Sequence, residues 1–138
     1  MRTLAVALLL LTTSAIAADL PRSRAPEGVV LYIIAPKDGD KVASPVTVRF
    51  GLKGMGIAPA GIALAATGHH HLLIDVSAPP FDRPIPADER HVHFGKGQTE
   101  AAVTLAPGRH RLQLLLGDHL HVPHEPPVLS APITITVE

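Results

Sequence analysis

The sequence predicts an all-β protein, a single antiparallel β-sandwich of the immunoglobulin-like type with about seven strands. Three observations favour this class. Short apolar stretches alternate with polar residues at a period of two, 14 prolines divide the chain into pieces that suit strands better than long helices, and turn signals separate those pieces. A length of 138 residues corresponds to about one domain.

The first three predicted strands lie in the N-terminal half. The stretch 29–34 (VVLYII) is apolar on both faces, as expected for a buried strand, and a turn (PKDGD) follows it. In 46–52 apolar residues alternate with Thr, Arg and Gly, the pattern of a half-buried strand. The small apolar stretch 54–67 is predicted as a loop, and 68–76 as the third strand.

Four further strands are predicted after a proline-rich connection at 78–89. Short strands at 90–94 and 101–105 precede the strongest one, 110–116, in which leucines alternate with Arg and Gln. The last strand, 133–137, alternates Ile and Val with Thr. Turn residues separate all four, which fits a sandwich rather than a helical fold.

The first 17 residues are predicted to be a secretory signal peptide. Arg2 precedes the apolar run Leu4–Leu11, and Ala15–Ala17 forms a small-x-small cleavage pattern. We expect cleavage after Ala17, a flexible leader over 18–28 and one histidine-rich domain over 29–138. The expected location is the periplasm or the outside of the cell. No stretch is long and apolar enough to predict a membrane span.

Composition excludes several classes of function. Twelve basic residues balance 12 acidic ones, whereas proteins that bind nucleic acid usually carry a basic excess. The absence of cysteine excludes disulfides, thiolate metal sites, blue-copper electron carriers and a lipid anchor on cysteine. Soft copper(I) sites are disfavoured for the same reason.

The nine histidines carry the only chemical signal, and all lie between residues 69 and 124. Residues i and i+2 of a strand share a face, so His69 and His71 should point one way and His70 the other. His91 and His93 should share a face, as should His119 and His121 if their segment is extended. Each His-x-His pair would offer two neutral ring nitrogens to a divalent metal. A structural role is expected for His70 and for the isolated His110.

These patterns predict a metal site with copper(II) as the favoured ion and zinc second, because imidazole suits both and copper(II) binds tightest among divalent ions. Calcium and magnesium prefer oxygen ligands, which are not clustered here. We expect Asp118 to orient one ring as an outer partner. The predicted ligands are His69, His71, His91, His93, His119, His121 and His124.

Two other classes of function stay open. A metalloenzyme would need an open coordination position and a general base, for which Glu100, Asp118 and Glu125 are candidates, but the sequence singles out none of them. We therefore favour a non-catalytic carrier, buffer or chaperone of the metal. Alternatively, the chain is a structural or interaction sandwich that binds a protein partner in the cell envelope, with the histidines in a hydrogen-bonded network.

Several strings resemble a known family. These are Thr67–Asp75 (TGHHHLLID), His91–Glu100 (HVHFGKGQTE), Leu105–His110 (LAPGRH), Gly117–His119 (GDH) and His121–His124 (HVPH). The chain resembles, over about residues 29–137, the small exported bacterial proteins grouped as domain of unknown function 4399. The resemblance implies a single exported domain and no particular activity. The metal hypothesis therefore depends on the histidines alone.

Overall fold

The computed structural model of the protein describes residues 20–138. The predicted signal peptide and its cleavage site lie outside these residues. Within residues 20–138 no helix is long and apolar enough to cross a membrane.

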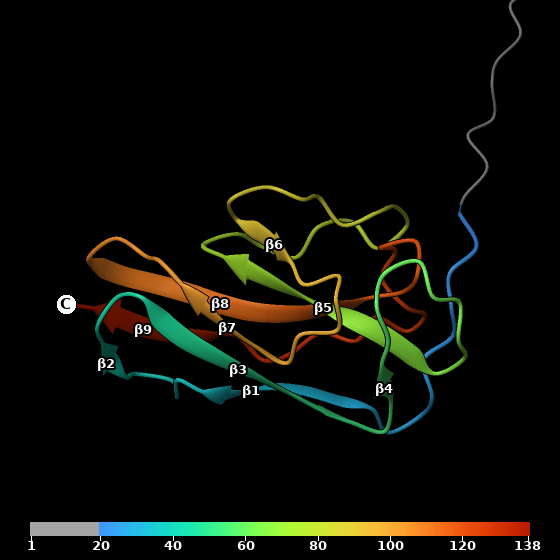
Figure 1. Cartoon of the computed structure of the whole chain (residues 1–138), viewed down its shortest axis with the longest axis horizontal. Helices are drawn as coiled ribbons and strands as arrows, with labels where there is room; N and C mark the ends of the chain where they lie inside the picture. Colours follow the sequence, from blue (N-terminus) through green and yellow to red (C-terminus); the bar gives the residue numbers. More distant parts are fainter. Residues whose placement is uncertain (1–19) are drawn as a thin grey trace, which may run out of the picture.

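Two β-sheets pack face to face (Figure 1). The smaller sheet has the strand order β1-β3-β7, and the larger one the order β2-β9-β8-β5-β4 with β6 paired to β5. The bounds of the strands are β1 Val30–Ala35, β2 Lys41–Val42, β3 Val46–Lys53, β4 Gly56–Ile57, β5 Thr67–Ile74, β6 His91–His93, β7 Glu100–Val103, β8 Gly108–Gly117 and β9 Ile133–Val137.

The all-β prediction is confirmed, and each of the seven predicted strands corresponds to one observed strand. Among residues 20–138 the structure adds two strands of two residues each, β2 and β4, which are too short to show any periodicity. Both pair in parallel with a neighbour, β2 with β9 and β4 with β5, while the other strand pairs are antiparallel. The immunoglobulin-like connectivity stays a prediction.

Alternating apolar side chains from both sheets fill the space between them. Val46, Val48 and Phe50 of β3 face Leu112 and its neighbours at 114 and 116 on β8. Burial of one such side chain stabilises the fold by about 1.5–3 kcal/mol. The sandwich can therefore be stable without disulfides.

The larger sheet is also covered on its outer face. Leu73 of β5 and Leu115 of β8 pack there with Ile85, which belongs to the proline-rich segment between β5 and β6. From Gly68 to Ile74, β5 is consequently buried on both faces. The histidines of β5 described next lie in this doubly covered strand.

Candidate metal centre

Strand β5 carries three consecutive histidines to opposite faces, as its alternation predicts. His69 and His71 lie on the outer face of the larger sheet, on the same side as Leu73. His70 faces the inner core, where its ring packs against Phe50 with 5.0 Å between ring centroids. All three histidines are 1% exposed or less, so the strand buries six polar ring nitrogens.

The third histidine of the outer face comes from β6. In the antiparallel pairing of β5 with β6, His93 lies directly opposite His71, and His91 lies opposite Leu73. The ring of His93 therefore lies beside those of His69 and His71, at centroid distances of 4.9 and 5.1 Å. Because the strands run in opposite directions, His91 is displaced along the sheet, away from His69.

The fourth histidine comes from the loop between β8 and β9. His121 has a φ of 63°, in the left-handed region, which is uncommon for a residue other than glycine. The backbone N–H of Ile85 donates to the carbonyl of His121 at 2.9 Å, tying this loop to the outer covering segment. Its ring lies 4.7 Å from that of His93, centroid to centroid.

These four side chains, His69, His71, His93 and His121, form what we call the histidine cluster. Each offers one ligand atom, and the four atoms lie within 4.8 Å of one another. Nε2 of His69 and Nδ1 of His121 are only 3.1 Å apart. In a tetrahedral zinc–imidazole site, neighbouring nitrogens are about 3.3 Å apart. The closest pair therefore already has the spacing of two ligands on one ion, while the widest separation in the cluster, up to 4.8 Å, is larger than that spacing.

Burial and mutual repulsion lower the pKa of three histidines of the cluster. Desolvation lowers the pKa of His71 to about 2, and repulsion from His69 and His93 adds to this effect. The pKa of His69 falls to about 4, first through desolvation and then through repulsion from His93 and His121. Desolvation also lowers the pKa of His93. Neutral imidazole is the form that binds a metal ion.

Two of the buried nitrogens in the cluster are left without a hydrogen bond. Nδ1 of His69 and Nδ1 of His71 have no partner. A buried polar group that makes no hydrogen bond costs about 1–3 kcal/mol. Buried polar groups without a hydrogen bond are uncommon in folded proteins, and a bound metal ion would use one nitrogen of each ring.

Two glycines make room for the rings. A Cβ atom on Gly95 would lie 2.3 Å from Cε1 of His93, and one on Gly117 would lie 2.6 Å from Cε1 of His71. Neither glycine has a φ in the left-handed region. The reason for glycine at these positions is therefore the space that the rings occupy.

Three of the predicted ligands lie outside the cluster. Nδ1–H of His91 donates to Asp88 at 2.8 Å, and Nε2–H of His124 donates to the carbonyl of Thr67 at 3.0 Å. The segment around His119 is a turn rather than an extended strand, so His119 does not share a face with His121. It lines a surface pocket instead.

Asp118 is buried next to the cluster, but its hydrogen bonds go elsewhere. Its Oδ1 accepts from the backbone N–H groups of Leu120 and Val122 at 2.9 and 3.1 Å, and its Oδ2 accepts from the Ser23 hydroxyl at 2.8 Å. Burial alone would raise the pKa of this carboxyl, but the three hydrogen bonds outweigh that effect and lower it. Asp118 therefore shapes the turn that carries His121.

The other candidate bases are engaged elsewhere. Glu100 lies on β7 in the smaller sheet and pairs with Arg49 at 3.5 Å. Glu125 is ion-paired with Arg22. Among residues 20–138 the cluster contains imidazoles alone and no carboxylate.

Sequence reasoning placed the two outer histidines of β5 correctly but missed the residues that support them. The roles of Gly95 and Gly117 depend on strand register, which one sequence does not specify. The side chain that bonds to Asp118 is that of Ser23, 95 positions away along the chain. The local signal that could have been used was the dipeptide Gly117-Asp118 directly after a strong strand, which is typical of a side-chain-capped turn.

Comparison with known proteins gives a family and no activity. A family model described as "Domain of unknown function (DUF4399)" matches residues 48–138. The resemblance seen in the sequence is thereby confirmed over that range. No curated protein and no solved structure matches the chain.

Proposed function

Because the chain belongs to the family of domains of unknown function DUF4399, whose name states no activity, we propose a function from the geometry of its histidines. The protein is an exported metal-binding protein that holds one divalent ion at His69, His71, His93 and His121. The observation that carries this proposal is the convergence of four imidazole ligand atoms within 4.8 Å. They come from β5, β6 and the loop after β8, so the folded chain assembles them.

The ligand set favours copper(II), with zinc second. Four neutral nitrogens and no carboxylate or sulfur match the ions that prefer imidazole, and copper(II) exceeds zinc in affinity at a generic nitrogen site. Zinc would take the four rings as a closed tetrahedral shell. Both ions are consistent with the distances within the cluster.

Storage or transfer of the ion fits the site better than catalysis. His69 and His71 are fully buried, whereas His93 is exposed and His121 is half-buried. His69 and His71 would therefore hold the ion on the buried side. An incoming ligand from solvent would replace His93 or His121 first. A hydrolytic metal site needs a water position with a general base, and the cluster offers no carboxylate for that role.

Calorimetric titration of tag-free mature protein with copper(II), and separately with zinc, tests this proposal. We expect one ion per chain, with micromolar or tighter affinity and tighter binding of copper(II). Competition between the two ions on one sample fixes their order. No binding of either ion, or binding that survives loss of both His69 and His71, would reject the site and leave the structural sandwich of the cell envelope as the better reading.

A further inference from the structure

The position of His121 depends on its loop more than that of any other cluster residue. His69, His71 and His93 are held by strand pairing, whereas His121 lies in the turn after β8. Within the turn, the N–H of His121 donates to the carbonyl of Asp118 and the N–H of Asp118 donates to that of Val122, both at 2.9 Å. What holds the turn against the rest of the molecule therefore decides where the fourth ring lies.

An N-terminal segment far away in sequence lies along this loop. We call Arg22–Ala25 the N-terminal strap; it belongs to the segment predicted as a flexible leader. The N–H of Ala25 donates to the carbonyl of Glu125, and the N–H of Glu125 donates to that of Ser23, each at 2.9 Å. Arg24 and Glu125 form a parallel β-bridge. The strap thus pairs with the loop like a short extra strand.

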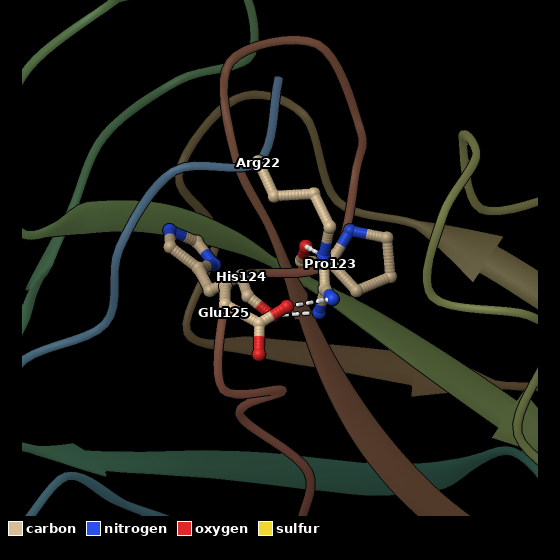
Figure 2. A network of polar contacts seen from close by, with 4 residues as sticks. All are labelled: Arg22, Pro123, His124 and Glu125. Carbon is tan, nitrogen blue, oxygen red and sulfur yellow. Dashed lines mark hydrogen bonds and ion pairs between the residues drawn. The ribbon is translucent and has the colours of Figure 1, made fainter. Parts of the chain in front are cut away.

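The Arg22 side chain makes the strongest connection. Its guanidinium donates to the carbonyl of Pro123 at 3.0 Å and also to the carbonyl of His124 and the carboxylate of Glu125 (Figure 2). The Arg22 guanidinium therefore bonds to three consecutive residues, 123–125, directly after the turn that contains His121. Hydrogen bonds from a charged donor are roughly twice as strong as neutral ones.

Ser23 reaches the other side of the same turn. Its hydroxyl donates to Oδ2 of Asp118 at 2.8 Å, while Oδ1 of that carboxylate caps the turn through Leu120 and Val122. Asp118 is 1% exposed, so the Ser23 hydroxyl supplies a hydrogen bond that water would make to an exposed carboxylate. The N-terminal strap therefore contacts the loop before His121, at Asp118, and after it, at residues 123–125.

We propose that the N-terminal strap positions the fourth ligand of the histidine cluster, with Arg22 and Ser23 as its positioning residues. The inference rests on the proposed metal-binding function. Loss of the strap contacts frees His121 to leave the ion, while the three strand-borne rings remain in place. Tight binding then requires the N-terminal segment to be seated on the domain.

The test compares the double variant Arg22→Gln/Ser23→Ala with Arg24→Gln in the otherwise intact mature protein. Arg24 is exposed, so its substitution removes one positive charge from the N-terminal strap and leaves the Arg22 and Ser23 contacts with the loop in place. We expect the double variant to bind copper(II) roughly tenfold more weakly, as loss of charge-assisted hydrogen bonds would produce. Arg24→Gln should match the wild type.

Electron paramagnetic resonance of the copper(II) complex separates positioning from a general loss of stability. The double variant should show the nitrogen coupling pattern of a His121→Ala variant, with one imidazole fewer than wild type. Unchanged affinity and an unchanged spectrum would overturn the inference while leaving the proposed function intact. Absence of copper binding by the wild type would reject the proposed function, and the strap's role in it.

Hydrogen exchange of the metal-free proteins supplies a readout that needs no ion. The amides of His121 and Val122 should exchange at least tenfold faster in the double variant, while those of β5 and β8 keep their protection. Equal exchange at His121 and Val122 in both proteins would overturn the inference. Faster exchange in β5 and β8 as well would also overturn it, since the strap would then support the whole fold.

Discussion

His70 and His71 are neighbours in one strand, and the comparison between them isolates what makes a metal site. Both are 1% exposed, both have nitrogens without a hydrogen bond, and desolvation lowers both pKa values, to about 4 and about 2. His71 faces three other imidazoles, whereas His70 faces Phe50 in the core between the sheets. Burial and a lowered pKa are therefore found on both faces of β5. The outer face differs only in that ring nitrogens of several histidines converge there.

The largest expected effect uses this pair directly. His71→Leu should weaken copper(II) binding by roughly 100-fold or more, since even loss of an outer-shell partner typically costs 10–100-fold. His70→Leu replaces the imidazole on the opposite face with an apolar side chain of similar size. Its copper(II) affinity should stay within about threefold of wild type. Calorimetric titration of both variants measures the difference. Equal losses in the two variants would show that the outer face is not special.

The second prediction concerns the stability of the metal-free protein in acid. In the unfolded chain the imidazoles gain protons around pH 6.5, but in the folded chain His69 and His70 do so only near pH 4 and His71 near pH 2. The unfolded state thus binds more protons, and the free energy of unfolding should fall from pH 6.5 towards pH 4, by up to about 1.4 kcal/mol per ring and pH unit. Denaturant titrations at several pH values check this.

The same experiment sharpens the comparison between the two faces. His70→Leu and His71→Leu should each reduce the slope of stability against pH, because each removes one depressed ring. Only the variant on the outer face should also lose metal binding. A slope unaffected by either substitution would contradict the account of the buried rings.

The third prediction tests the space reserved for His93. Gly95→Ala should displace this exposed ring and weaken copper(II) binding by roughly tenfold, since a misplaced ligand loses part of its bond to the ion. Gly51→Ala is the matched control: its Cβ would lie 2.3 Å from the Tyr32 ring, the same distance as in the Gly95 contact, but on the smaller sheet. Similar melting temperatures with different metal affinities would support the role of Gly95; equal affinities would not.

The smallest effect is expected at His110, where a histidine lies in the opposite electrostatic setting. Its Nδ1 and Nε2 both lie 2.7 Å from oxygen acceptors, in Asp75 and in the carbonyl of Ala106. The Ala106 carbonyl and the Asp75 carboxylate raise its pKa, because both bonds are made only when both nitrogens carry protons.

The stabilisation from His110 should therefore be complete below pH 6.5 and disappear as the pH rises through the folded-state pKa. His110→Gln should lower the free energy of unfolding at pH 5.5 by at most about 1 kcal/mol, and less at pH 8.5. Copper(II) binding should stay unchanged. A larger loss at pH 8.5 than at pH 5.5 would contradict the assigned direction.

The sequence predicts the fold well because the fold depends on local alternation. The leucines of β8 and the separation of His70 from its two neighbours follow from a period of two, and both are confirmed. The family resemblance is confirmed too. The two-residue strands β2 and β4 carry no such pattern and could not be predicted.

The composition of the cluster depends on long-range geometry that periodicity cannot supply. His91 and His93 are equivalent by spacing, and only the antiparallel register with β5 places one of them beside His71. His121 reaches the cluster from a turn in which it has a left-handed backbone conformation. The chain directly after this turn is bonded to Arg22, about 100 positions earlier. These relations arise from tertiary packing, so seven histidines were candidate ligands and four converge.

The central claim is that four particular imidazoles share one ion, and nitrogen NMR of labelled histidine rings during titration with zinc tests it most directly. One equivalent of zinc should shift the ring nitrogens of His69, His71, His93 and His121, and leave those of His70 and His110 in place. Unshifted rings in the cluster, or a response confined to His91, His119 and His124, would contradict the claim.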